Sequence, residues 1–360
     1  MPLLAALLVL LLLPAAAGAQ IPVLDLRVGE PIGKRAKADG RMVLGDVRTR
    51  IGIERRGTDS DFFPKRSYAL ELRGDRGGER DLPLLGLPAD DDWVLTAAYR
   101  DRTLLRNHIG YAAARHVGRW APGTRFVEVV LDGRPQGLYV LTERIQLAAG
   151  RVRAPRGSAI VELSDRGRGD FRGPVTRRPY ELVSPGDPGR ALRARAARRI
   201  AAAERDPGRV GGAVEAVLLQ ELFGNVDGLR RSTYLVVPPS GPVRFGPVWD
   251  LDRGFGDAFF PGPQLTTGLV TRHHPYARVL LRRPAFRAAL AERWRAWRAA
   301  GIREALIGAL DEGAAAIAPA AERDHALWRQ PAQRGFAEEV ADVRAWIEHR
   351  VGWLDSNLGG

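Results

Sequence analysis

Apolar and polar residues alternate along the first half of the chain, from about residue 42 to residue 153. This alternation predicts short β-strands, and it is clearest over residues 47–54 and 67–72. Two further strands are expected on either side of Asp132-Gly133, because this dipeptide favours a tight hairpin turn.

Helical spacing of apolar residues is found at one place in the first half and over much of the second. A helix is expected from Asp101 to about Val117, with Asp101 as its N-cap. Residues 189–223 predict two helices with a break near Pro207. The chain from His274 to its end is expected to be helical throughout, apart from short breaks.

Two segments of the second half are expected to differ from this pattern. Residues 165–188 are rich in Gly, Pro and Arg and are predicted to form a loop, whereas 234–237 and 243–251 look like a pair of strands. The chain therefore divides into a strand-rich part over 20–150 and a mostly helical part over 151–360. This arrangement defines an α+β fold.

The first residues of the chain carry no charge before Asp25. Their apolar centre, Leu3 to Leu13, has the length of a secretory signal and is too short to span a bilayer. Ala19 ends a run of small residues that fits a signal peptidase site. Residues 1–19 are therefore expected to be a signal peptide, and the mature chain to be secreted or periplasmic without a transmembrane segment. An uncleaved anchor is the alternative.

The chain has 55 Lys and Arg residues against 42 Asp and Glu, a net charge of +13. This charge favours acidic protein segments or anionic envelope polymers as partners. Specific nucleic-acid binding is not expected, because the arginines are spread over helices with Ala between them. The absence of Cys excludes disulfides and thiolate catalysis. The only lysines are Lys34, Lys37 and Lys65, and Lys65 stands beside a predicted strand, where a compact ammonium suits a phosphate.

Two segments carry carboxylates at the ends of predicted elements, an arrangement that is suited to phosphoryl transfer. Asp227 follows a predicted helix and precedes a strand, with Ser232 five residues later. Asp250 and Asp252 follow the next strand, and an Asp-x-Asp pattern on a strand would place both carboxylates on one face, suited to Mg²⁺ or Mn²⁺. In phosphoryl transfer one carboxylate acts on the attacking hydroxyl and another holds the metal. The plainer alternative is that Asp227-Gly228 forms a turn and Asp252 caps a helix.

Several short blocks follow one another between about residues 45 and 260. They are Arg56-Gly57-Thr58-Asp59-Ser60, Pro64-Lys65-Arg66-Ser67-Tyr68, Asp92-Trp93-Val94-Leu95, residues 101–107, 127–133 and 137–145, and Trp249-Asp250-Leu251-Asp252. In this order they resemble the CotH (spore coat protein H) kinase family. The resemblance implies an atypical, two-lobed protein-kinase-like fold over about 42–360. It also implies ATP, Mg²⁺ or Mn²⁺, and transfer of the γ-phosphate to Ser or Thr of a protein.

The resemblance also implies roles for individual residues. Asp227 would be the catalytic Asp, Lys65 would contact the ATP phosphates, and Asp250 would be the main metal ligand with Asp252 beside it. Ser232 stands where the family usually has Asn, and a hydroxyl is a weaker metal ligand than an amide oxygen.

Three further residues complete the implied nucleotide site. Arg56 belongs to the first block of the resemblance. Glu143 would line the nucleotide cleft near the connection between the lobes. Arg106 would reach a phosphate or pair with Glu143.

A non-catalytic envelope or adhesion module of the same fold is the alternative from another functional class. The four residues that argue for an enzyme are Lys65, Asp227, Asp250 and Asp252, because a binding module has no need to keep them together. Ser-hydrolase and Walker-type motifs are absent from the sequence.

Overall fold

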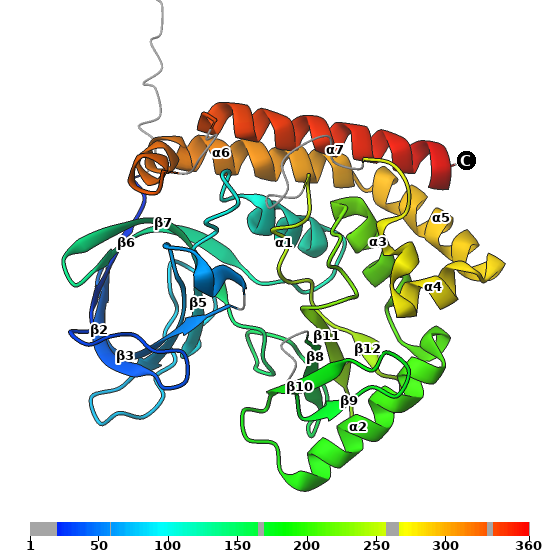
Figure 1. Cartoon of the computed structure of the whole chain (residues 1–360), viewed down its shortest axis with the longest axis horizontal. Helices are drawn as coiled ribbons and strands as arrows, with labels where there is room; N and C mark the ends of the chain where they lie inside the picture. Colours follow the sequence, from blue (N-terminus) through cyan, green and yellow to red (C-terminus); the bar gives the residue numbers. More distant parts are fainter. Residues whose placement is uncertain (1–19, 58, 165–168, 257–265, 330–333, 360) are drawn as a thin grey trace, which may run out of the picture.

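A computed structural model of the chain describes residues 20–57, 59–164, 169–256, 266–329 and 334–359. The expected signal peptide, residues 1–19, lies outside the described residues. The chain is α+β, with a strand-rich N-terminal region and a C-terminal region that ends in long helices (Figure 1). The predicted fold class is confirmed at this level. Within the described ranges, no helix combines the length and the apolar character needed to cross a membrane.

The N-terminal strands close into a barrel in the order β1-β2-β3-β4-β5-β7-β6. Their bounds are β1 Val23–Arg27, β2 Ala38–Leu44, β3 Val47–Arg56, β4 Ser67–Arg73, β5 Asp92–Thr96, β6 Thr124–Leu131 and β7 Arg134–Glu143. Alternate side chains fill the interior, as Leu70 and Leu72 of β4 do. Strands begin earlier than residue 42, because the parallel pairing of β1 with β6 closes the barrel, and this distant partner is not visible in the local pattern.

The predicted hairpin is confirmed at the turn between β6 and β7. Asp132 and Gly133 have φ angles of 49° and 80°, the left-handed values that a two-residue hairpin turn requires. The Asp132 carboxylate also accepts hydrogen bonds from the backbone N–H groups of Val28 (2.7 Å) and Gly29 (3.2 Å). The turn is thereby tied to the end of β1.

Helix α1 spans Arg106–His116, so the expected start at Asp101 is wrong by one turn. Residues 101–105 instead fold around the Asp101 carboxylate, and Leu104 takes a left-handed φ of 56° that no helix allows. Asp101 still supports the helix start, because its Oδ2 accepts from the backbone N–H of Arg106 at 2.9 Å.

A second, five-stranded sheet has the order β12-β11-β8-β10-β9. Its strands are β8 Ala159–Leu163, β9 Phe171–Arg172, β10 Pro179–Ser184, β11 Thr233–Val237 and β12 Arg244–Phe245. The expected loop over 165–188 is wrong where β9 and β10 lie. Strand β10 pairs with β8 and buries Tyr180 and Leu182, so a distant partner overrides a loop-like composition.

The predicted helices of the C-terminal region are confirmed. They are α2 Arg190–Arg205, α3 Ala213–Phe223, α4 Pro275–Leu281, α5 Pro284–Ala299, α6 Ile302–Leu327 and α7 Phe336–Leu358, with a 3₁₀ turn at Pro207–Arg209. In Figure 1, α6 and α7 run side by side along the top, with the barrel on the lower left and the second sheet on the lower right. Helix α6 packs against α1, α7 and β7, and so links the two regions.

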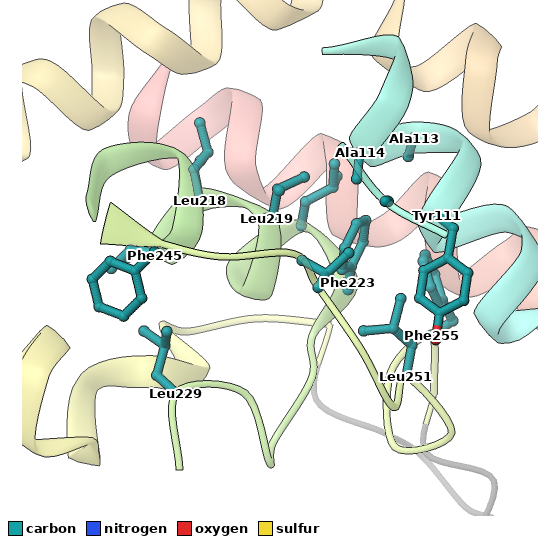
Figure 2. Close-up of a cluster of buried hydrophobic side chains, with 14 of the residues drawn as sticks. Tyr111, Ala113, Ala114, Leu218, Leu219, Phe223, Leu229, Phe245, Leu251 and Phe255 are labelled. Atoms are coloured by element: carbon teal, nitrogen blue, oxygen red, sulfur yellow. The ribbon is translucent and has the colours of Figure 1, made fainter. Parts of the chain in front are cut away.

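The segment after β12 is anchored by apolar side chains. Figure 2 shows Leu251 and Phe255 in one buried cluster with Tyr111 of α1 and Phe223 of α3. The rings of Phe223 and Phe255 are 5.2 Å apart. Gly110 of α1 lies directly against Leu251, which is fully buried. The helix therefore positions the loop that carries Asp250 and Asp252.

We expect Gly110→Ala to destabilise the protein relative to a matched change elsewhere. The new Cβ would lie 2.1 Å from Cδ1 of Leu251, and overpacking of this kind costs about 1–3 kcal/mol. Gly308→Ala in α6 is the control, because nothing lies within 4 Å of its Cβ position and Ala favours a helix over Gly by about 1 kcal/mol. Thermal unfolding followed by circular dichroism should give a lower Tm for Gly110→Ala only. Equal Tm values for the two variants would contradict the close packing.

Candidate active site

A cleft of about 130 Å³ is lined by residues of the barrel, α1, β8 and the loops that follow α3 and β12. Expected site residues that line it are Arg56, Lys65, Asp227, Ser232, Asp250 and Asp252. The structure thus brings together residues that are far apart in the sequence. This volume is below the ~300–1,000 Å³ of common ligand pockets.

Asp250 and Asp252 lie on a loop, and their expected place on a strand is wrong. Strand β12 ends at Phe245, and Asp250 has a left-handed φ of 60° that a strand does not contain. Both carboxylates nevertheless face the same cleft. The Ser232 hydroxyl donates to Oδ2 of Asp250 at 3.0 Å. The loop is thus shaped by contacts from other segments rather than by strand pairing.

Asn107 of α1 holds the Asp252 end of this loop. Its Nδ2 donates to Oδ1 of Asp252 at 2.6 Å, and its Oδ1 accepts from the backbone N–H of Leu251 at 2.9 Å. One amide side chain therefore fixes both the loop backbone and a carboxylate. The sequence contained Asn107 only as the last residue of a family block, and nothing local indicated this contact.

The two carboxylates are suited to a divalent cation. Asp250 is exposed to the cleft, but the protein atoms packed around its carboxyl group desolvate it and raise its pKa, while the Ser232 hydrogen bond and the charge of Arg231 oppose that shift. Burial and the charges of Asp250 and Asp101 raise the pKa of Asp252 to about 8. A bound cation would relieve this repulsion. Among the described residues, no group of three His, Asp or Glu side chains that could hold a metal ion is found.

Asp227 lies in the turn between α3 and β11, surrounded by arginines. Its Oδ2 accepts from Nη2 of Arg231 at 2.5 Å, and its Oδ1 is 3.5 Å from Nη1 of Arg253. Asn225 accepts from the backbone N–H of Asp227 and donates to the backbone oxygen of Asp250 at 3.4 Å. Asn225, which sequence reasoning missed, therefore connects the turn of Asp227 with the loop of Asp250.

Lys65 lies in a bend just before β4, and only 1% of its surface is exposed. Its Nζ donates to Oδ1 of Asp324 in α6 at 2.7 Å and to the backbone oxygen of Leu138 in β7 at 2.5 Å. Burial lowers the pKa of Lys65, and the charge of Asp324 opposes that shift. Gly137 leaves room for this contact, because a Cβ there would lie 2.2 Å from Oδ1 of Asp324. The sequence did not reveal Asp324, since 259 residues separate it from Lys65.

The expected pairing of Arg106 with Glu143 is wrong. Arg106 forms an ion pair with Asp101 and donates to the backbone oxygen of Gly254 at 3.2 Å. Glu143 accepts from Nη1 of Arg151 at 2.6 Å. Both side chains are buried, and neither is among the described residues that line the cleft. Arg106 therefore pairs with Asp101 and Glu143 with Arg151 instead of with each other. These contacts stabilise the framework around the site.

Arg56 lies at the end of β3 and lines the cleft. Its guanidinium group stands 5.2 Å from the ring centre of Trp249, and Trp249 stacks on Tyr111 of α1 at 5.9 Å. This stack places a cation next to the start of the Asp250 loop. Arg56 can therefore meet an anionic group that approaches the two carboxylates together with a metal.

A protein-family model described as CotH kinase protein matches residues 53–176 and 213–354. These ranges cover well over half of the chain, and the protein belongs to the CotH kinase family. The family predicted from the sequence blocks is confirmed, and the protein is kinase-like in this sense. No curated protein matched the chain.

Among solved structures, one similar chain comes from the toxin–antitoxin complex of HipA, HipB and its operator DNA from Shewanella oneidensis MR-1. The sequence identity is 19% and the TM-score 0.33, over 81% of this chain and 65% of that one. The chain therefore spans slightly less than two thirds of the length of this neighbour. A similarity of this size carries no argument about the site.

Proposed function

We propose that the protein is an ATP-dependent protein kinase that uses Mg²⁺ or Mn²⁺, with the barrel and the helical region as the two lobes of an atypical kinase fold. The observation that carries this proposal is the meeting of Asp227, Asp250 and Asp252, from two different loops, in one cleft. Phosphoryl transfer needs carboxylates in two roles, and the membership of the CotH kinase family supports the same function.

We propose different roles for the carboxylates, in agreement with the family resemblance and with their contacts. Asp250 and Asp252 would hold the metal, with the Ser232 hydroxyl bonded to Asp250. When bound, the metal neutralises charge on the phosphates. Asp227 would orient the attacking hydroxyl and accept its proton. Because Asn225 bonds to both loops, it would keep Asp227 at a constant distance from Asp250.

Lys65 would contribute one hydrogen bond to a phosphate. An ammonium group has three N–H donors, and two of them are used by Asp324 and Leu138. We propose that the third meets a phosphate oxygen at the cleft wall, where only 1% of Lys65 is exposed and its Nζ lies 4.8 Å from the ring centre of Tyr139. Arg231 and Arg253 also line the cleft and add positive charge near Asp227. We propose a protein substrate with Ser or Thr next to acidic residues, in agreement with these charges and the net charge of +13.

The test is phosphoryl transfer with a matched pair of variants. The chain is incubated with γ-labelled ATP and Mg²⁺ or Mn²⁺, and autophosphorylation and transfer to an acidic Ser-containing peptide are followed by mass spectrometry. ATP affinity measured by calorimetry should rise with the metal. Asp250→Ala should abolish both this rise and the transfer, whereas exposed Asp187, which is not among the cleft-lining residues, should tolerate the same change.

A non-catalytic module of the same fold makes a different prediction for this experiment. It would show no transfer with either metal and no difference between Asp250→Ala and Asp187→Ala. That result would contradict the proposed kinase activity.

The uncharged, Leu-rich residues 1–19 support export of this kinase. The exported chain would then begin at Gln20, and sequencing the N-terminus of protein from an exporting host measures this directly. An intact Met1 on the exported protein would contradict cleavage.

A further inference from the structure

A second pocket, of about 470 Å³, lies where the barrel region joins the second sheet. Its residues on the barrel side are Pro88, 118–120 and 149–153, and on the sheet side Val236 and 244–247. It shares no described lining residue with the cleft of Asp227 and Asp250. Its volume falls within the ~300–1,000 Å³ typical of ligand pockets.

The lining of this pocket is positively charged. Arg119, Arg151, Arg153 and Arg244 contribute to it, and no Asp or Glu is found among its described lining residues. Burial lowers the pKa of Arg119, the charge of Glu215 opposes that shift, and the charges of Arg244 and Arg293 add to it. Nη2 of Arg119 donates to the backbone oxygen of Phe245 at 2.9 Å, which holds this guanidinium at the pocket, where it would stabilise an anion.

Arg151 has hydrogen-bond donors that the described protein does not satisfy. Only 1% of the residue is exposed, and its Nη1 donates to Oε1 of Glu143 (2.6 Å) and to the backbone oxygen of Pro88 (3.3 Å). Its Nη2 and Nε have no hydrogen-bond partner among the described residues, although Nε lies 3.7 Å from Oδ2 of Asp90. The Arg151 side chain has no exposed surface, and its guanidinium lies 4.9 Å from the ring centre of Trp93. It therefore supplies buried positive charge behind the pocket wall rather than a donor to a ligand.

An apolar surface lies beside these arginines. Trp120 is partly buried and lines the pocket, together with Val152 and Pro247. The face of an indole suits an aromatic or similarly flat group. The pocket thus offers positive charge and a flat apolar wall to the same ligand.

We propose that this pocket binds an oxyanion, a phosphate or a carboxylate, carried on an aromatic or similarly flat apolar group. Arg119 and Arg244 meet the oxyanion, the buried charge of Arg151 adds positive potential from behind the pocket wall, and the flat group lies against Trp120. The inference does not rest on the proposed kinase activity, because the two sites share no described lining residue. A ligand here touches both the barrel side and the sheet side, and so stabilises their junction.

The test measures ligand binding to the full chain without ATP. Calorimetry with phenyl phosphate, benzoate and inorganic phosphate should show one site, with an aryl oxyanion binding more tightly than inorganic phosphate. Tighter binding of phenyl phosphate than of benzoate assigns a phosphate ligand, and the reverse order assigns a carboxylate. Arg244→Ala should weaken binding about tenfold, the effect of one lost charge-assisted hydrogen bond. Arg295→Ala, at an exposed position of α5, should leave it unchanged.

Arg151 needs a conservative change, because its removal would leave Glu143 buried without its ion-pair partner. Arg151→Lys keeps the buried charge next to Glu143, so a folded protein with nearly unchanged aryl oxyanion binding is expected. Three results would overturn the proposal. They are no binding of either aryl oxyanion at millimolar concentration, equal affinity in Arg244→Ala and wild type, and complete competition by ATP and Mg²⁺, which would place the ligand in the other cleft.

Discussion

Replacing Asp227 with Asn should lower the rate of phosphoryl transfer by about 10²-fold or more, the usual loss when a general base is removed. An amide has the size of the carboxylate and can still accept a hydrogen bond from Arg231, which lies at 2.5 Å. It cannot take the proton of the attacking hydroxyl. Because this proton transfer belongs to the transition state, ATP affinity should stay nearly unchanged.

Asp206→Asn is the matched control for this change. Asp206 also pairs with two arginines, Arg209 at 3.1 Å and Arg283 at 3.2 Å, but it is not among the described residues that line the cleft. Its replacement should leave turnover unchanged. Single-turnover transfer and ATP affinity should be measured for both variants, with a thermal melt to confirm folding. Unchanged transfer in Asp227→Asn would contradict the role of Asp227 as the base that accepts the proton.

Removing the Lys65 side chain should destabilise the fold as well as the site. Lys65→Ala leaves Asp324 buried without its cation, and breaking a buried ion pair in this way costs about 3–5 kcal/mol. Denaturant unfolding should show this loss in the free energy of unfolding. Lys34→Ala is the control, because the exposed pair of Lys34 with Asp61 at 3.4 Å should contribute less than about 1 kcal/mol.

A double variant separates stability from ATP binding. Lys65→Met with Asp324→Asn removes both buried charges and keeps an acceptor for the backbone N–H of Leu138, which lies 2.9 Å from Asp324. Most of the lost stability should return, since apolar replacement of a buried ion pair is often close to neutral. Weak ATP binding in this stable protein would assign Lys65 to the phosphates. Affinity equal to that of the wild type would show that Lys65 acts only in the framework.

Strands and helices were predicted well where the signal is local. The hairpin at Asp132-Gly133 was recognised because two residues determine the turn, and the C-terminal helices because their apolar spacing repeats over many turns. The prediction failed over 165–188 and before residue 42. There, β10 and β1 are strands only because β8 and β6 pair with them, and composition does not show such partners.

The candidate site also has features that local sequence predicts and features that depend on distant partners. The order of short blocks along the chain predicted the family, and the placement of carboxylates after predicted elements singled out Asp227, Asp250 and Asp252 without any coordinates. The sequence does not predict roles that depend on a distant contact partner. Arg106 and Glu143 are both buried and charged, but each pairs with a residue that the linear pattern does not connect to it.

What the sequence by itself determined is therefore the chemistry available and the local conformation, since both depend on residues a few positions apart. The tertiary structure alone decided which groups meet. It brings Asp324 within hydrogen-bond distance of Lys65, and it allows Asn107 to bind the loop of Asp252. It also gave Asp250 a left-handed backbone where a strand was expected. A hydrogen bond acts over about 3 Å, and only folding brings residues from distant parts of the chain within that distance.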